Sequence, residues 1–205
     1  MRTPRAVLLA LPGLSLGVAG LFHPMHLGYG TARAWWVLHV LGMFVFPLVG
    51  VALAWLFRGR RDVVAVLAVL LAYVYAVAYT ALDVISGVAA GYVTDRLGPG
   101  RPRPDEVRYL FAIGGPTGEW GSRALMLAAL LVAADALWRH RSRALPGVLL
   151  LPGAYLVHVH HIFAPEGVTG MVLIGLATGW LGYLQGSPAP RSGRTPVTAS
   201  RSTGP

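Results

Sequence analysis

The 205-residue chain contains neither cysteine nor lysine. The absence of cysteine excludes disulfides, thiolate metal sites, iron–sulfur clusters and cysteine nucleophiles. The absence of lysine excludes a catalytic lysine and a retinal-type Schiff base. Any metal ion bound by side chains would therefore depend on histidine, aspartate or glutamate.

Charged residues are also scarce, at 12% of the chain against about 25% in soluble domains. Hydrophobic residues make up 55% of the chain, and the mean hydropathy is +0.60. The apolar residues form long blocks with short charged clusters between them, as a bilayer requires, because lipid solvates neither charge nor free backbone groups. The sequence predicts an all-α polytopic helix bundle in the plasma membrane, in contact with the lipid bilayer.

About 20 apolar residues are needed for one helix to cross a bilayer. On that criterion we expect about six membrane-spanning helices. The first follows Arg2 and Arg5 as a signal peptide would, but its possible cleavage site near Ala19 is poor, so we expect it to be retained. The six expected segments are Ala6–Phe22, Trp35–Phe57, Val63–Val93, Gly118–Trp138, Leu145–Phe163 and Val168–Leu184.

Arginine distribution predicts the orientation, because cytoplasmic loops carry the excess of basic residues. Eleven arginines lie at one set of segment ends, and five lie in the opposite loops. Both termini are therefore predicted to be cytoplasmic, with a bundle over residues 1–184 and a disordered cytoplasmic tail over 185–205. The net charge of +9 does not indicate nucleic-acid binding, since no basic helix or aromatic–basic stripe is present. The first set is Arg2, Arg5, Arg58, Arg60, Arg61, Arg139, Arg141, Arg143, Arg191, Arg194 and Arg201, and the second is Arg33, Arg96, Arg101, Arg103 and Arg108.

Two local features concern packing. The long outer loop Thr94–Pro116 is expected to contain a short interfacial helix over Asp105–Ile113, with Val107, Leu110 and Phe111 facing lipid. Glycines also recur at four-residue spacing, which permits close helix approach within a bundle. These pairs are Gly13 and Gly17, Gly87 and Gly91, and Gly175 and Gly179.

Unusual polar residues gather on the predicted outer side. Six of the seven histidines fall there, together with Asp83, Glu119 and Arg123. Ionisable residues within a membrane are costly, and they mark a functional site or a buried pair. Glu119 and Arg123 also have the i, i+4 spacing of a simple ion pair, and His23 and His26 have a plain interpretation as interfacial loop residues.

We therefore interpret His39, His158 and His161 as candidate metal ligands, with Asp83 as a candidate catalytic residue beside Glu119 and Arg123. His158 and His161, at i, i+3, are expected to share one face of a helix. Neutral imidazoles with carboxylates suit zinc or copper, and two histidines from separate helices can also bind a haem iron.

Three segments carry a resemblance. Trp36–Gly42 (WVLHVLG), Tyr79–Gly91 (YTALDVISGVAAG) and His161–Met171 (HIFAPEGVTGM) resemble those of multi-pass membrane proteins of GC-rich bacteria whose function is not established. The resemblance implies that His39, Asp83 and the end of the fifth segment belong to one site.

Three hypotheses of function follow. In the first, an outer-side pocket binds a metal ion or haem for redox or lipid-directed chemistry. In the second, the protein is an accessory or structural subunit that binds a membrane protein partner or forms a homo-oligomer. In the third, it is a proton-coupled transporter of a small solute, with Asp83 and His39 exchanging protons. The chain matches no HExxH, Walker or Rossmann pattern that would decide among them.

Overall fold

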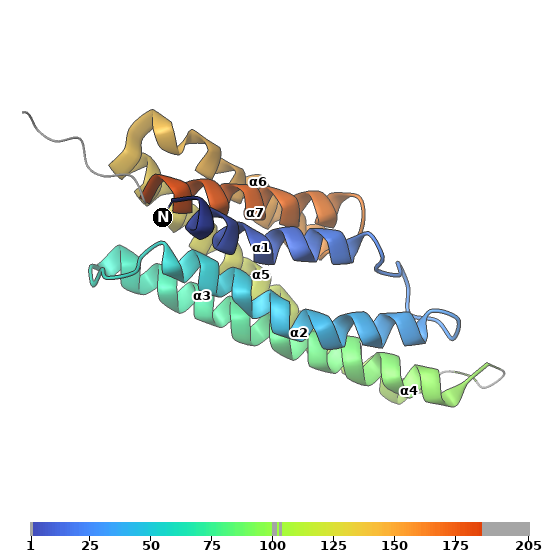
Figure 1. Cartoon of the computed structure of the whole chain (residues 1–205). Helices are drawn as coiled ribbons and strands as arrows, with labels where there is room; N and C mark the ends of the chain where they lie inside the picture. Colours follow the sequence, from blue (N-terminus) through green and yellow to red (C-terminus); the bar gives the residue numbers. More distant parts are fainter. Residues whose placement is uncertain (1, 100–101, 103, 186–205) are drawn as a thin grey trace, which may run out of the picture.

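The computed structural model describes residues 2–99, 102 and 104–185, and all regular structure in that part of the chain is helical. This confirms the predicted all-α class. Figure 1 shows long helices running side by side. In chain order they are α1 (Arg2–Gly20), α2 (Ala32–Trp55), α3 (Val63–Leu82), the π-helix η1 (Asp83–Ala89), α4 (Ala90–Leu97), α5 (Asp105–His140), the 3₁₀-helix η2 (Arg141–Leu149), α6 (Leu150–His160) and α7 (Glu166–Gln185).

Within the described residues, five helical stretches are long and apolar enough to cross a membrane. The fourth, Asp105–His160, contains both the fourth and the fifth predicted segments, because α5, η2 and α6 follow one another without a break. Arg141, the first residue of η2, has a left-handed φ of 53°, and α6 packs against both α5 and α7. The predicted tail lies outside the described residues, apart from Gln185, which ends α7.

Close glycine contacts join α1 to α7. A methyl group at Gly13 would lie 2.6 Å from the backbone nitrogen of Gly175, and one at Gly179 would lie 2.9 Å from Ala10 Cβ. Such contacts allow two backbones to approach closely in lipid, where packing rather than the hydrophobic effect drives helix association. The predicted role of these glycines in packing within the bundle is confirmed.

The third stretch is one long rod made of α3, η1 and α4, and it contains a π-helical segment that begins at Asp83. π-helical turns are rare, and they occur frequently at functional sites. Gly87 in η1 lies directly under the ring of His39 from α2, so that a Cβ at this position would overlap the ring. The irregular segment therefore brings the chain of α2 and the side chain of Asp83 close together.

Helix α5 begins earlier in the chain than the sequence predicted. Asp105–Ile113 forms the first turns of α5 rather than a separate interfacial helix, and Val107 is fully buried instead of facing lipid. The physical reason is contact with the preceding rod, because α5 packs against α4 and η1, with Gly114 against Ser86. Figure 1 shows this α4–α5 end extending beyond the ends of α1 and α7.

Candidate metal centre

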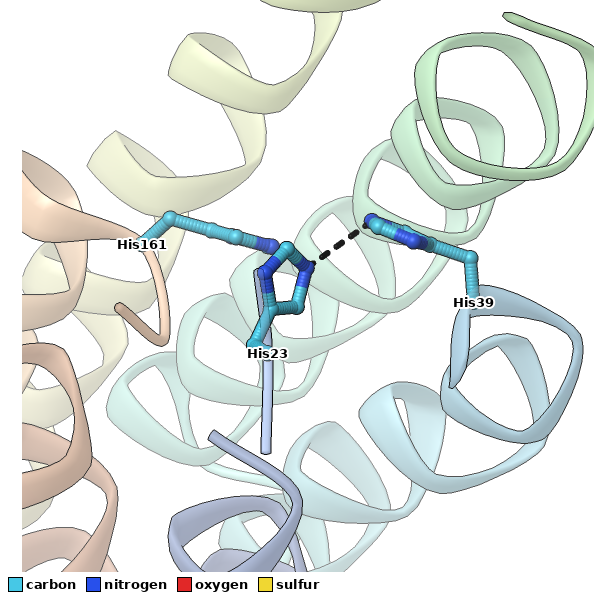
Figure 2. Close-up of side chains that lie close together, drawn as sticks. All are labelled: His23, His39 and His161. Carbon is cyan, nitrogen blue, oxygen red and sulfur yellow. Dashed lines mark hydrogen bonds between the residues drawn. The ribbon is translucent and has the colours of Figure 1, made fainter. Parts of the chain in front are cut away.

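Three histidines from separate parts of the chain meet inside the bundle. His23 follows the end of α1, His39 lies two turns into α2, and His161 follows the end of α6. One ring nitrogen from each lies within 4.8 Å of the other two. Figure 2 shows the three rings converging, with His23 between the other two.

Backbone carbonyls fix the orientation of two of these rings. Nδ1 of His39 lies 2.7 Å from the carbonyl oxygen of Trp35, and Nδ1 of His23 lies 2.8 Å from that of Pro24. A carbonyl oxygen only accepts, so each Nδ1 must carry the hydrogen and donate it. In the neutral ring this leaves Nε2 with a free lone pair, which is the arrangement typical of metal-binding histidines.

The two free nitrogens face each other. His23 Nε2 and His39 Nε2 are 3.4 Å apart, and both residues are buried, with 7% and 6% of their surface exposed. Two lone pairs at this distance repel unless a proton or a metal ion lies between them. Ligands bound tetrahedrally at 2.0–2.1 Å from zinc are separated by about 3.4 Å, so the spacing fits a shared ion.

Asp83 provides an acidic group beside the histidines. Its side chain is fully buried, and neither carboxylate oxygen has a hydrogen-bond partner. Oδ1 lies 4.0 Å from His39 Nε2. A methyl group at Gly42 would lie 2.7 Å from the other oxygen, so glycine is what allows α2 to approach this carboxylate. An unpaired buried carboxylate is costly unless a cation or proton compensates it.

Aromatic rings enclose the three histidines. His161 stacks on Phe46 and Tyr79, with ring centroids 5.5 and 5.6 Å away. His23 meets Phe163 edge-on at 4.7 Å. Burial lowers the pKa of His23, and so favours the neutral imidazole that binds metal. One nitrogen from each of the three rings lies within 4.8 Å of the other two, which is a spacing that one ion bound by all three could use.

An open cleft leads to this group. It has a volume of about 470 Å³ and lies between α2, η1, α5 and the end of α6. His39 and His161 line one part of it, and Ser122, His158 and Glu119 line another. His39 and His161 therefore lie at the wall of a space that a small ligand could enter.

The structure brings together only some of the predicted site residues. His39, His161 and Asp83 are neighbours, as expected. His158 lies apart, with its Nδ1 2.8 Å from Ser122 Oγ, and its role as a ligand stays a prediction.

Glu119 and Arg123 form an exposed ion pair on α5, with a separation of 2.6 Å and about half of each side chain in contact with the surroundings. This geometry agrees with the simple i, i+4 pair that their spacing indicates. Their catalytic role also stays a prediction, since neither carboxylate nor guanidinium is part of the histidine group.

His23 is the member that sequence reasoning assigned instead to an interfacial loop. It lies in the turn between α1 and α2, and nothing local shows that this turn folds inward. The available signal was its position between Phe22 and Pro24, where an apolar neighbour and a turn residue flank a titratable one.

Comparison of the chain with protein-family models, with characterised proteins and with solved structures found no match. The assignment of function therefore depends on the site itself. Three imidazoles and one carboxylate in a mostly apolar enclosure form a donor set for a borderline divalent ion. The described part of the chain has five helical stretches long and apolar enough to cross a membrane.

Proposed function

We propose that the chain crosses the plasma membrane six times with both termini in the cytoplasm, and binds one zinc ion on its outer side through His23, His39 and His161. The observation that carries the proposal is the pair of buried Nε2 atoms 3.4 Å apart, each with its Nδ1 held by a carbonyl. Neither nitrogen has a hydrogen for the other, so a cation resolves the contact.

The topology is supported by α6 packing back against α5, which makes one long stretch serve as two crossings. With that count the histidines lie at the end of the bundle opposite to Arg60, Asp135 and Arg139. The arginine excess places the latter end in the cytoplasm.

Three histidine ligands leave a fourth position for water or substrate, as in catalytic zinc sites. A zinc ion held by His23, His39 and His161 would supply an activated water and would polarise a carbonyl or phosphoryl oxygen. Asp83 is placed to balance the charge of the ion and to accept a proton. We infer a metal-dependent enzyme that acts at the outer membrane surface.

The test is metal analysis of the purified protein after incubation with zinc and removal of the unbound excess. We expect about one zinc per chain in the wild type and in His26→Ala, whose exposed ring lies in the same turn as His23. We expect almost none in His23→Ala. Equal zinc in the two variants, or no zinc in the wild type, would contradict the proposal.

Proton-coupled transport is the second candidate, because further polar side chains precede Asp83 along α3. Tyr75 and Tyr79 precede it at four-residue intervals, and the Tyr75 hydroxyl is buried without a hydrogen-bond partner. Buried polar groups of this kind often bind water. Asp83→Asn separates the two functions, because it abolishes proton-coupled uptake in a transporter but only weakens zinc binding in a metalloenzyme. Copurification of a stoichiometric partner would instead favour an accessory role.

A further inference from the structure

The cleft beside the three histidines has an apolar wall and a polar wall. Leu82, Phe111 and Val157 contribute to the apolar part. Glu119 and His158 contribute to the polar part. Its volume of about 470 Å³ lies in the range of sites that enclose one small molecule or the polar end of a larger one.

The helices that form its mouth are apolar on their outer surfaces. On α5, Ile113 and Trp120 are 59% and 67% exposed, and on α6, Tyr155 and Val159 are 58% and 52% exposed. In a membrane-spanning bundle, lipid covers such side chains. The mouth of the cleft is therefore continuous with the apolar part of the bilayer, and an acyl chain can enter it without crossing water.

The polar wall offers hydrogen-bond acceptors. Ser122 Oγ donates to the carbonyl oxygen of Glu119 at 3.0 Å, which is a common bond for serine within a helix. The hydroxyl then accepts from Nδ1 of His158, 2.8 Å away, and Nε2 of His158 is left with its lone pair. A ligand that donates a hydrogen bond, such as a hydroxyl group, matches this wall.

We propose that the cleft binds one acyl lipid with a hydroxyl-bearing head group, taken from the membrane leaflet at the histidine end. The acyl chain lies against Leu82 and Phe111 and extends to the bilayer, and a head-group hydroxyl donates to His158 Nε2. The head group thereby reaches the metal ligands His39 and His161. This assignment of a substrate class rests on the proposed metal site.

The probe for the test is a monoacylglycerol with a photoreactive diazirine in its acyl chain. Zinc-loaded protein is reconstituted into phosphatidylcholine vesicles, irradiated with the probe, and mapped by peptide mass spectrometry. We expect labelling concentrated on α5 near Phe111 and on α6 near Val157. A probe with both hydroxyls methylated is expected to label the cleft roughly tenfold less, because it cannot donate to His158.

Variants that fill the cleft provide the matched comparison. No atom lies within 4 Å of a Cβ built on Gly115, so Gly115→Leu places its side chain in open space. Val159→Trp fills the cleft from α6. It replaces Gly115→Leu in the experiment if that variant folds poorly. Both are expected to reduce labelling roughly tenfold, whereas Ile113→Trp, on the same helix but outside the cleft lining, leaves it unchanged.

Zinc content measured on the same samples distinguishes the two proposals. Zinc binding with labelling spread evenly over the exposed helices, or unaffected by both filling variants, overturns the lipid assignment alone. Cleft-selective labelling in a protein that binds no zinc supports the lipid and overturns the metal site. Selective displacement of the probe by free glycerol would show a water-soluble ligand, and so would also overturn the lipid assignment.

Discussion

The two ends of the bundle differ in how their ionisable side chains are paired. At one end, Arg60 donates two hydrogen bonds to Asp135, at 2.6 and 3.0 Å, and two more to Asp62, at 2.8 and 2.9 Å. Arg139 also bonds to Asp135 at 3.0 Å. Every charge in this group has an opposite partner in good geometry.

At the other end, buried polar groups in and beside the histidine group have no such partners. Asp83 is buried with both oxygens unbonded, and His161 Nδ1 is also buried and unbonded. His23 and His39 direct lone pairs at each other. In a group that only stabilises the fold, we expect every charged or polar atom to have a partner within the group, as in the arginine group. The histidine group needs an added proton or cation to satisfy these atoms, as the proposed metal site would supply.

The substitution with the largest expected effect on this comparison is Gly87→Ala. A Cβ at this position would overlap the His39 ring, so we expect the ring or the helix to move. The unfolding free energy is expected to fall by about 1–3 kcal/mol, as in other overpacked cores, and zinc binding is expected to be lost. Zinc titration and thermal denaturation measure the two effects. Gly115→Ala, in open space, is the control, and similar behaviour of both variants would show that the packing under His39 is unimportant.

Exchanging one carboxylate for an amide at each end sharpens the contrast. Asp83→Asn is expected to weaken zinc binding about 10–100-fold, as removal of outer groups at metal sites does. It is also expected to stabilise the zinc-free protein, because an unpaired buried carboxylate is removed.

Asp135→Asn is the matched change at the arginine end. It is expected to lower the unfolding free energy by about 1–2 kcal/mol, because two arginines lose their shared partner, and to leave zinc affinity unchanged. Calorimetric titration measures the zinc affinity of each variant, and thermal denaturation with and without zinc measures its stability. If the two variants behave alike, the proposed distinction between the ends is wrong.

The smallest expected effect is acid sensitivity at the arginine end. Hydrogen bonds from Arg60 lower the pKa of Asp62 from 3.8 to about 2. Because the folded-state pKa is lowered, the stability from this carboxylate is present above pH 3.8 and is lost as the pH falls through about 2. The difference in melting temperature between zinc-free wild type and Asp62→Asn is therefore expected to be small at pH 5 and to vanish near pH 2. A constant difference over this range would contradict the assignment.

The helical class and the joining of His39 with Asp83 could be predicted, because hydropathy and depth along a spanning helix are properties of the sequence. The pairing of His158 with His161 on one helix face was predicted from their spacing. The structure ends α6 at His160, and His161 has a left-handed φ of 53°. That reversal directs its ring to the histidine group and leaves His158 with Ser122.

Other features depended on tertiary contacts that local patterns do not encode. His23 is buried because its turn is covered by Trp35 and Phe163, which come from distant positions in the chain. The early start of α5 follows from its packing against α4 and η1. The π-helix at Asp83 has no sequence signal of its own.

The convergence of His23, His39 and His161 also has a consequence for the folded chain as a whole. An ion shared by these three would cross-link the end of α1, the start of α2 and the end of α6, and so would close two loops of the chain at once. Closing a loop reduces the conformational entropy of the unfolded state, which is the usual explanation of how a disulfide stabilises. In this protein, which has no cysteine, the metal ion would act as the cross-link that a disulfide provides elsewhere.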